Sequence, residues 1–318
     1  MANGTTDRIL IVGAGVIGSL YGYMLGKAGY DVTVLARGGR LLDLRANGLR
    51  LFCKRKSKML APQPVKLVEE LLPDDTYDYV FVALRRDNLP GIYPALAANA
   101  SPNIVFMSNN PYGGEEYSAH IPLPKVLMAF PGAAGDMVDG VVHYTILSRA
   151  MQPTTVGCYM SSQHKALHGL EAALKASGFP VSVCDDIDSW LLTHAAMICP
   201  LTNAIYHAGG TNLTAARSRQ TMRLTARALK EAFGFLAASS DFRITPAKLK
   251  VFLYAPVRLL SFALSVAYRT KAVKAMMPDS SSHSRKEMQL LTKEVAELAG
   301  REGFEMNAFR QLAHREER

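Results

Sequence analysis

The chain has 318 residues, of which 49% are apolar, so it can form two domains and bury a sizeable core. Its 36 Lys and Arg residues exceed its 27 Asp and Glu residues, and the net charge of +9 suits an anionic small molecule. The basic residues are spread along the chain without an aromatic-interleaved stripe, so we expect no nucleic-acid partner.

The four cysteines are far apart and form no CxxC pair, and no His and Cys residues have the spacing of metal ligands. The first apolar stretch is short and starts only after Asp7 and Arg8, which does not resemble a secretory signal. These features predict reduced thiols, a cytoplasmic location and no metal site.

The first elements in chain order are a strand at 8–12, a glycine-rich turn, a helix at 15–28 and a second strand at 31–35. In this context a GxGxxG pattern predicts a dinucleotide-binding turn, in which the helix amino terminus offers N–H groups to phosphates. The first glycine permits a tight turn, the second lets a pyrophosphate approach, and the third allows close packing. A glycine turn without a ligand is the alternative. The residues expected to contact the cofactor are Gly13, Ala14, Gly15, Val16, Ile17 and Gly18.

The end of the second strand distinguishes between the two nicotinamide cofactors. An NAD site usually has Asp or Glu at this place, whereas this chain has Arg37 and Arg40 and no carboxylate. Arg37 can pair with a 2′-phosphate, and Arg40 can add a second charge. The sequence therefore predicts NADP as the cofactor, and a solvated basic loop is the alternative.

The rest of the first half alternates between strands and helices, as in a parallel sheet. Strands are expected at 49–53, 78–84, 103–107, 125–130 and 180–184, helices at 88–98 and 163–176, and the runs at 141–147 and 154–157 should extend the edge of the same sheet.

The second half has almost no strand pattern. Helices are expected at 187–207, 214–239, 246–268, 283–301 and 305–315. The sequence thus predicts an α/β Rossmann-type dinucleotide-binding domain over residues 1–184, followed by an all-α substrate and dimerisation domain over residues 185–318. The longest apolar stretch, 251–268, contains Pro256 and Arg258, so we expect a buried or partner-facing helix, with a homodimer as one option, and no membrane partner.

Besides the glycine turn, four segments of the sequence are informative, namely Leu35-Ala36-Arg37, Val82-Ala83-Leu84-Arg85, Ser108-Asn109-Asn110-Pro111 and Cys199-Pro200-Leu201-Thr202. Together they resemble the ketopantoate reductase (2-dehydropantoate 2-reductase) family. The resemblance implies a 6-phosphogluconate-dehydrogenase-like fold and an NADPH-dependent oxidoreductase that reduces a 2-keto acid to a 2-hydroxy acid. The family activity, in pantothenate biosynthesis, converts 2-dehydropantoate into pantoate.

The resemblance also implies roles for individual residues. Leu84 and Arg85 would contact the cofactor, with Arg85, beside Arg86, in place of the usual lysine. Asn110 would touch the nicotinamide and the substrate, although the family's following glycine is Pro111 here. Glu287 would orient the substrate. Apart from the resemblance, either Arg85 or Arg285 can hold the substrate carboxylate, and a solvated face is the alternative for Arg285. Ser280, Ser281 and Ser282 would replace the family serine that aligns with Ala275, or would merely cap a helix.

The chain departs from the family at the proton donor. Leu191 stands at the position of the catalytic lysine and Ala195 at that of a conserved asparagine. His194, one helical turn after Leu191, could donate the proton if its pKa were ordinary. The alternative is a hydrogen-bonded helix histidine without a catalytic role.

Three functions remain open from the sequence. The first is an NADPH-dependent reductase with His194, Asn110 and Glu287 as catalytic residues. The second is a catalytically altered NADP-binding regulatory or partner-binding protein on the same fold, which Leu191, Ala195 and Ala275 support. The third is a related enzyme that acts on imines or oxidises hydroxy acids.

Overall fold

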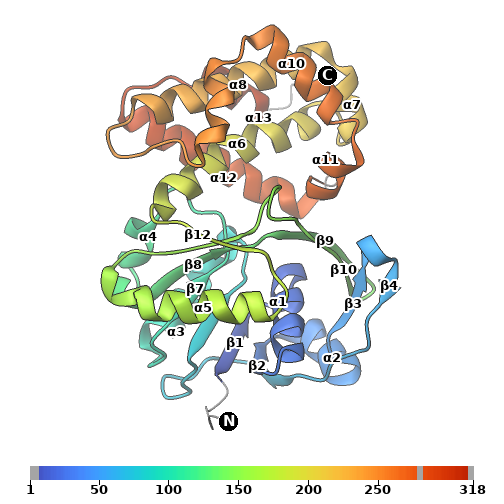
Figure 1. The fold of residues 1–318 in the computed structure, drawn as a ribbon, viewed down its shortest axis with the longest axis vertical. Coiled ribbons are helices and arrows are strands. Elements are labelled where there is room, and N and C mark those ends of the chain that lie inside the picture. Colours follow the sequence, from blue (N-terminus) through green and yellow to red (C-terminus); the bar gives the residue numbers. More distant parts are fainter. Residues whose placement is uncertain (1–6, 278–281, 314–318) are drawn as a thin grey trace. The chain divides into compact units, whose positions relative to one another are not determined.

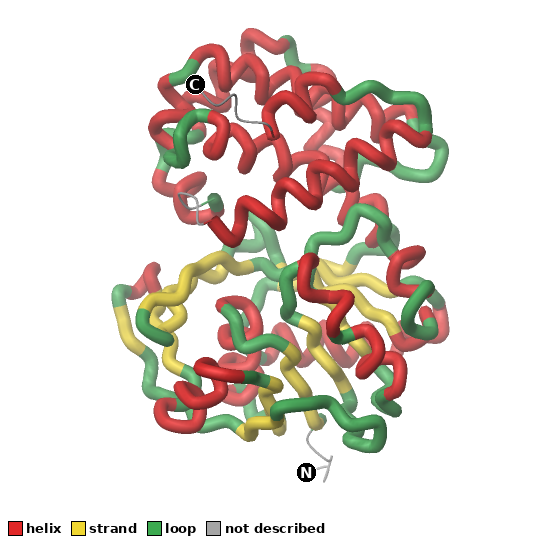
Figure 2. The backbone as a smooth tube through the Cα atoms, turned by 180° about the vertical axis from the view of Figure 1, so that it is seen from behind, coloured by secondary structure: helices red, strands yellow, loops and turns green. Residues whose placement is uncertain are grey.

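The computed structural model of the chain describes residues 7–277 and 282–313, which form two compact units (Figures 1 and 2). The first unit contains residues up to 108 and residues 114–187, and the second contains residues 109–113 and the residues from 188 onward. The sequence does not reveal that the short segment 109–113 belongs with the helical unit.

An eight-stranded sheet forms the centre of the first unit. All neighbouring strands are parallel except β8 and β11, and the central strands β1, β6 and β7 are almost entirely buried, as is usual in a Rossmann-type sheet. The predicted fold class is therefore confirmed. In sheet order the strands are β12 (Val181–Val183), β11 (Thr154–Cys158), β8 (Val126–Phe130), β7 (Ile104–Phe106), β6 (Tyr79–Val82), β1 (Arg8–Val12), β2 (Asp31–Leu35) and β5 (Lys66–Val68).

A second, four-stranded sheet corrects two expectations. The strands near 49–53 and 141–147 do not extend the main sheet but pair with each other in the order β4-β3-β10-β9. A tight turn at Asp139 and Gly140, both with positive φ, makes β9 and β10 a hairpin that pairs away from the main sheet. The bounds are β3 (Arg50–Cys53), β4 (Lys58–Met59), β9 (Ala133–Val138) and β10 (Val141–Ile146).

Five α-helices accompany these sheets among the described residues. The helices expected at 15–28 and 163–176 are confirmed, but the one expected at 88–98 begins only at Tyr93, because Pro90 lies in a 3-10 turn before it. The helix directly after β2 was not predicted, since two glycines begin it. The helices are α1 (Val16–Lys27), α2 (Gly38–Asn47), α3 (Tyr93–Ala98), α4 (Gly114–Ser118) and α5 (His164–Ala176).

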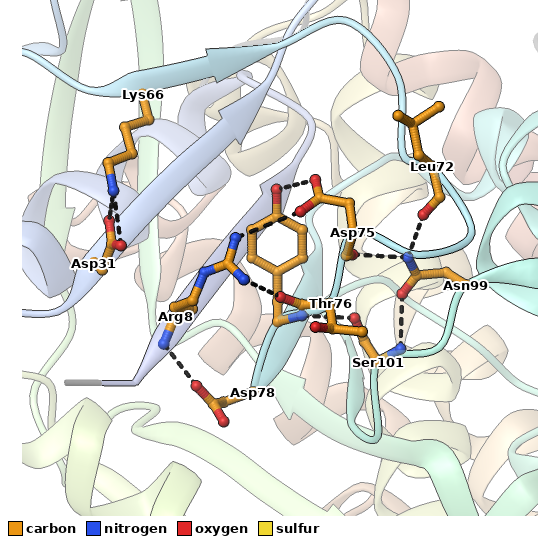
Figure 3. Close-up of polar contacts among 10 residues, drawn as sticks. Arg8, Asp31, Lys66, Leu72, Asp75, Thr76, Asp78, Asn99 and Ser101 are labelled. Carbon is orange, nitrogen blue, oxygen red and sulfur yellow. Dashed lines mark hydrogen bonds and ion pairs between the residues drawn. The ribbon is translucent and has the colours of Figure 1, made fainter. Parts of the chain in front are cut away.

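Polar contacts fasten the amino-terminal ends of the central strands (Figure 3). The backbone N–H of Arg8 donates to Asp78 at 2.7 Å, and its guanidinium donates to the carbonyl of Thr76 at 2.8 Å. The side-chain amide of Asn99 donates to the carbonyl of Asp75 at 2.9 Å. These contacts lie at the amino-terminal ends of the strands. The glycine turn follows the carboxyl end of β1, at the opposite end of the sheet, and that end is therefore the place for a ligand.

The described part of the second unit is entirely helical. The helices expected at 214–239 and 246–268 are each broken, because Ser218 caps a new helix and Pro256 separates two others. The helices are α6 (Ile187–His207), α7 (Asn212–Arg217), α8 (Arg219–Ala238), α9 (Val251–Tyr254), α10 (Val257–Ala267), α11 (Lys271–Met276), α12 (Ser282–Arg301) and α13 (Asn307–Ala313).

Helix α8 is central to this unit, since it packs against α7, α9, α10 and α13. Its fully buried side chains include Leu229, Phe233 and Phe235. Of the described helices, none has by itself the length and apolar content of a membrane span, although Ala247–Tyr254 and Val257–Ala267 reach them as a pair that bends by 120°.

Candidate functional site

Close packing explains two of the three glycines in the turn after β1. Gly13 has a φ of +104°, and a Cβ on it would lie 2.8 Å from the carbonyl oxygen of Ala83. A Cβ on Gly18 would lie 1.9 Å from the carbonyl oxygen of Gly13. A side chain at either position would force the turn away from its neighbours, so these glycines are needed for the fold itself.

The middle glycine, Gly15, has no such role in packing. A Cβ on it would meet no atom within 4 Å, and its φ of −74° is open to any residue. Gly15 is the N-cap of α1 and makes no side-chain capping bond. Open space before an uncapped helix amino terminus fits a phosphate group. The turn therefore fits the pyrophosphate of a dinucleotide.

Arg37 is available for a ligand at the end of β2. It is the N-cap of α2, its side chain is exposed, and its Nε donates to the carbonyl oxygen of Glu69 at 2.9 Å. The Glu69 carboxylate pairs with Arg45 instead. Within the described ranges, the two terminal nitrogens of Arg37 have no hydrogen-bond partner, so their N–H groups can donate to a phosphate.

Arg40 is not available in the same way, which corrects the expectation that it adds a second charge for the phosphate. Its Nε donates to the carbonyl oxygen of Ala14 and its Nη2 to the hydroxyl of Ser19, both at 3.0 Å. Its Nη1 donates to the carbonyl oxygen of Gly140 at 3.1 Å and pairs with Asp43. Burial lowers the pKa of Arg40, and Asp43 partly offsets this shift. Arg40 thus braces the glycine turn.

Of the two arginines after β6, one is exposed and the other is held in a network of protein contacts. Arg85 is exposed and its Nε lies 3.3 Å from Asp87, so its predicted contact with the cofactor stays a prediction. Arg86 is buried and pairs with Glu116 at 2.7 Å, while the hydroxyl of Tyr93 donates to the same carboxylate at 3.0 Å. Arg86 is therefore part of a structural network and is no second ligand cation.

Asn110 does not have the free amide that its expected role requires. It is fully buried, and its Oδ1 accepts from the backbone N–H groups of Tyr112 at 2.9 Å and Gly113 at 3.1 Å. Its Nδ2 donates to the carbonyl oxygen of Gly113 at 2.8 Å. The side chain therefore stabilises its own loop, and because it is fully buried it presents no group at the surface for orienting a substrate carbonyl.

The preceding residue, Asn109, is better placed. Its Nδ2 lies 3.5 Å from Oε1 of Glu287, and its Oδ1 is buried without a hydrogen-bond partner in the part of the chain that the structure describes. Two candidate residues far apart in sequence are thus brought together. The sequence shows both asparagines, but two adjacent asparagines do not indicate which side chain contacts Glu287.

Two residues join Asn109 and Glu287 in what we call the α6–α12 polar cluster, namely Tyr206 and Arg285. The guanidinium carbon of Arg285 lies 5.9 Å from the centre of the Tyr206 ring. Burial raises the pKa of Tyr206, Glu287 adds to this shift, and Arg285 opposes it. Sequence reasoning missed Tyr206, because only the packing of α6 against α12 reveals its neighbours.

His194 lies on α6 in a buried, aromatic environment. Its ring stacks on Trp190 with centroids 5.2 Å apart and planes 5° apart. Burial lowers its pKa to about 4. The expectation of an ordinary pKa is therefore wrong, and the imidazole is neutral at pH 7. A neutral ring still has one N–H that can donate a hydrogen bond.

The positions that replace the family lysine and asparagine are apolar and inaccessible. Leu191 is 2% exposed and Ala195 is 1% exposed. Neither can bind a substrate in this conformation. Of the serines expected near the substrate, Ser280 and Ser281 lie outside the described residues, and the structure does not describe the side chains of Ser282 and Ala275.

The described residues contain no group of His, Cys, Asp and Glu side chains that could hold a metal ion. All four cysteines are free thiols. Asn203, which shares a helix with His194, donates to the hydroxyl of Thr292 at 2.9 Å in the core. Its role is thus to link α6 to α12.

The fold and the glycine turn together define a Rossmann-type protein with a helical second unit. Residues 9–159 match the model of the family described as ketopantoate reductase PanE/ApbA. The match agrees with the resemblance that the sequence shows. The family name describes oxidoreductases that act on a C=O/CH–OH pair.

Individual known proteins are similar to the chain as well. A 2-dehydropantoate 2-reductase from Mesorhizobium japonicum is 37% identical over 107 residues, which is 32% of this chain and 31% of the relative. The chain thus matches about a third of that relative's length. A ternary structure of D-mandelate dehydrogenase with NADH and anilino(oxo)acetate is similar with a TM-score of 0.76, 14% identity and 96% coverage of both chains. A PanE/ApbA family ketopantoate reductase from Ralstonia eutropha JMP134 is similar with a TM-score of 0.74, 18% identity and 96% coverage of both chains. At these identities, the solved structures establish the fold.

Proposed function

We propose that this chain is a nicotinamide-dinucleotide-dependent reductase that converts a 2-keto acid into a 2-hydroxy acid and prefers NADPH. The open space at Gly15, before the uncapped amino terminus of α1, is the observation that carries the proposal. The family of residues 9–159 supports the same reaction class.

In this proposal the first unit binds the dinucleotide. The turn from Gly13 to Gly18 would hold the pyrophosphate, and Arg37 would pair with the 2′-phosphate of NADP. Leu84 and Arg85 would contact the cofactor beyond β6, because the N–H of Ala83 bonds to the carbonyl oxygen of Val12 and keeps this strand end beside the turn. When bound, the reduced cofactor supplies a hydride.

The α6–α12 polar cluster would bind the anionic substrate. The charge of Arg285 suits a carboxylate, and the ring of Tyr206 beneath its guanidinium favours one placement of that group. The amide of Asn109 would orient the carbonyl group, and Glu287 would accept a hydrogen bond from the product hydroxyl. These roles replace the one first expected for Asn110.

The proton that completes the reduction has no strong donor among the predicted residues. His194 is neutral, so we propose that its N–H hydrogen-bonds the developing alkoxide and that the proton comes from water. Because a positioned acid contributes about 10²–10⁴ in rate, turnover should be slow compared with an enzyme that has a lysine there.

One observation favours the second function, an NADP-binding regulatory or partner-binding protein. Leu191 and Ala195 are buried, so the helix offers no polar group at two positions where the family has catalytic ones. Cofactor binding without turnover would follow from this arrangement.

Among the 2-keto acids, 2-dehydropantoate is one candidate substrate. Pantothenate biosynthesis would be the pathway in that case. We also infer a cytoplasmic location, because four free thiols persist in a reducing compartment.

The deciding experiment measures the oxidation of NADPH and NADH with a panel of 2-keto acids that includes 2-dehydropantoate. The reverse reaction is measured with 2-hydroxy acids, and cofactor binding is titrated in parallel. Turnover by the original chain, together with its loss in the Gly15→Val variant, supports the reductase. Binding without turnover in either direction supports the regulatory protein, and absence of binding contradicts both.

A further inference from the structure

The excess positive charge of the chain is concentrated in the helical unit. Residues 189–278 contain 12 of the 36 Lys and Arg residues but only 2 of the 27 Asp and Glu residues. The rest of the chain holds 24 basic and 25 acidic residues and is therefore close to neutral. This distribution corrects the expectation that the basic residues are evenly spread.

Helix α10 has apolar side chains on two faces. Leu260 and Leu264 are buried in the core of the unit. Leu259, Phe262 and Val266 are 60%, 68% and 50% exposed. At about 100° per residue, these three side chains lie within roughly 60° of one another on the helix surface. They form an outward-facing row that we call the apolar stripe.

The preceding helix and the bend extend this surface. Tyr254 on α9 is 74% exposed and Val251 is 54% exposed. The bend between α9 and α10 is held by Lys230 of α8, whose Nζ donates to the carbonyl oxygens of Leu253 and, at 3.0 Å, Ala255. The exposed apolar residues thus sit on a fixed support.

Exposed basic side chains on α8 and α10 form what we call the basic border. On α8, Arg219, Arg223 and Arg227 are exposed and lie within roughly 60° of the direction of Lys230, so they share one side of this helix with it. Arg258, one turn before Phe262, is exposed as well. Figure 1 shows α8 and α10 next to each other, in agreement with their packing.

We propose that this surface binds an anionic phospholipid bilayer. The apolar stripe would enter the boundary between headgroups and acyl chains, and the arginines of α8 would contact lipid phosphates. Exposed Leu, Phe and Val side chains next to exposed arginines are the composition of a helix that lies in the plane of a membrane surface. The proposal is independent of the proposed enzymatic function.

A lipid surface fits this composition better than a second copy of the chain. A symmetric contact would bring the same basic border of two copies together, and residues 242–278 contain no acidic residue to compensate. Nucleic-acid phosphates would pair with the arginines but leave the apolar stripe in water. The sequence argument against a membrane partner concerns a span, in which Arg258 would be costly. In a helix at the surface Arg258 stays at headgroup level.

The test is co-sedimentation of the full chain with vesicles. We expect binding to mixed phosphatidylcholine and phosphatidylserine vesicles, weakening with salt, and none to pure phosphatidylcholine. The variant L259S/F262S should lose about tenfold or more in affinity. The variant R219Q/R223Q/R227Q should lose about a hundredfold. These residues are exposed, so circular dichroism should show an unchanged fold.

Matched changes in the first unit serve as controls. L42S alters a side chain that is 65% exposed on α2, and K54Q/R55Q/K56Q removes three charges from an exposed 3-10 turn. Both should bind vesicles like the original chain. Absence of binding to anionic vesicles, or equal losses in the controls, would overturn the proposal. So would a lipid-free dimer that L259S/F262S dissociates, if no vesicle binding is found.

Discussion

The guanidinium of Arg40 donates a 3.0 Å hydrogen bond to the carbonyl oxygen of Ala14, so a side chain of α2 fastens the middle of the glycine turn. The same guanidinium holds the hydroxyl of Ser19 on α1. Arg37, only three residues earlier, has no contact of this kind with the turn among the described residues. The two arginines should therefore affect cofactor binding differently.

Replacing Arg40 with alanine should weaken NADPH and NADH binding by similar factors. The change removes the bonds of the guanidinium to the Ala14 carbonyl, Ser19 and Asp43, so α2 no longer holds the turn in place. We expect the free energy of unfolding to fall by about 2–3 kcal/mol, as for a partly buried hydrogen-bonded charge. Urea unfolding and titration with both cofactors measure the two effects. A loss confined to NADPH would show that Arg40 contacts the 2′-phosphate instead.

Replacing Arg37 with alanine should weaken NADPH binding about 10- to 100-fold and change NADH binding about twofold or less. Only NADPH has the 2′-phosphate, and the exposed side chain contributes one bond to Glu69 in the protein. Titration of the protein with each cofactor measures the ratio. Arg45→Ala is the control, because Arg45 is also exposed on α2 and pairs with Glu69. Equal losses for the two cofactors would refute the role of Arg37.

Gly15→Val should abolish cofactor binding without unfolding the protein. The added side chain meets no protein atom within 4 Å of its Cβ, and the backbone there has an ordinary φ. It would fill the space that a pyrophosphate needs. Calorimetric titration and thermal unfolding separate the two properties. Gly18→Ala provides the contrast, since its Cβ would lie 1.9 Å from the Gly13 carbonyl oxygen and should destabilise the fold.

The glycine turn was predictable because its strand, turn and helix are neighbours in sequence. The separate sheet of β3 and β10 was not, since its pairing joins residues about 90 positions apart and neither strand specifies its partner. The brace by Arg40 was missed for a related reason. An arginine after β2 suggests a ligand contact, and only the folded turn shows that its donors are already used.

The helical unit illustrates the same limit. Its helices follow from apolar periodicity, but the contact of Asn109 with Glu287 depends on where the loop after β7 runs. A sequence also gives the ordinary pKa of a histidine and not its burial. His194 could therefore be placed on α6 correctly and still be assigned the wrong protonation state.

Alanine substitutions of the two adjacent asparagines should have different effects, one on stability and the other on catalysis. Asn110→Ala removes three buried hydrogen bonds inside the loop 109–113, so the free energy of unfolding should fall by about 2–3 kcal/mol. Asn109→Ala should leave stability nearly unchanged and lower kcat/KM about 10- to 100-fold, because this amide faces Glu287.

Urea unfolding and steady-state kinetics of both variants test this assignment. Asn109→Asp serves as a further control, since it keeps the size of the side chain but brings a second negative charge to Glu287. It should reduce turnover at least as much as alanine does. If Asn110→Ala is fully folded but has lost turnover, Asn110 and not Asn109 contacts the substrate.

His194 should make the stability of the protein depend on pH. Its pKa is about 4 in the folded chain and 6.5 in the unfolded one, because burial disfavours the charged ring. Between these values the unfolded state binds more protons, so the stabilisation is complete above pH 6.5 and is lost as the pH falls toward 4. The total loss is about 3 kcal/mol.

His194→Phe keeps an aromatic ring beside Trp190 but cannot titrate. We therefore expect the unfolding free energy of the original protein, minus that of the variant, to fall as the pH is lowered from about 7 to 4. Both values are measured in urea, and carboxylate effects that the two proteins share cancel in the difference. A constant difference would contradict the lowered pKa. In kinetics, the same variant should lower kcat without moving the pH profile above pH 5, since a neutral imidazole contributes a hydrogen bond and no titrating proton.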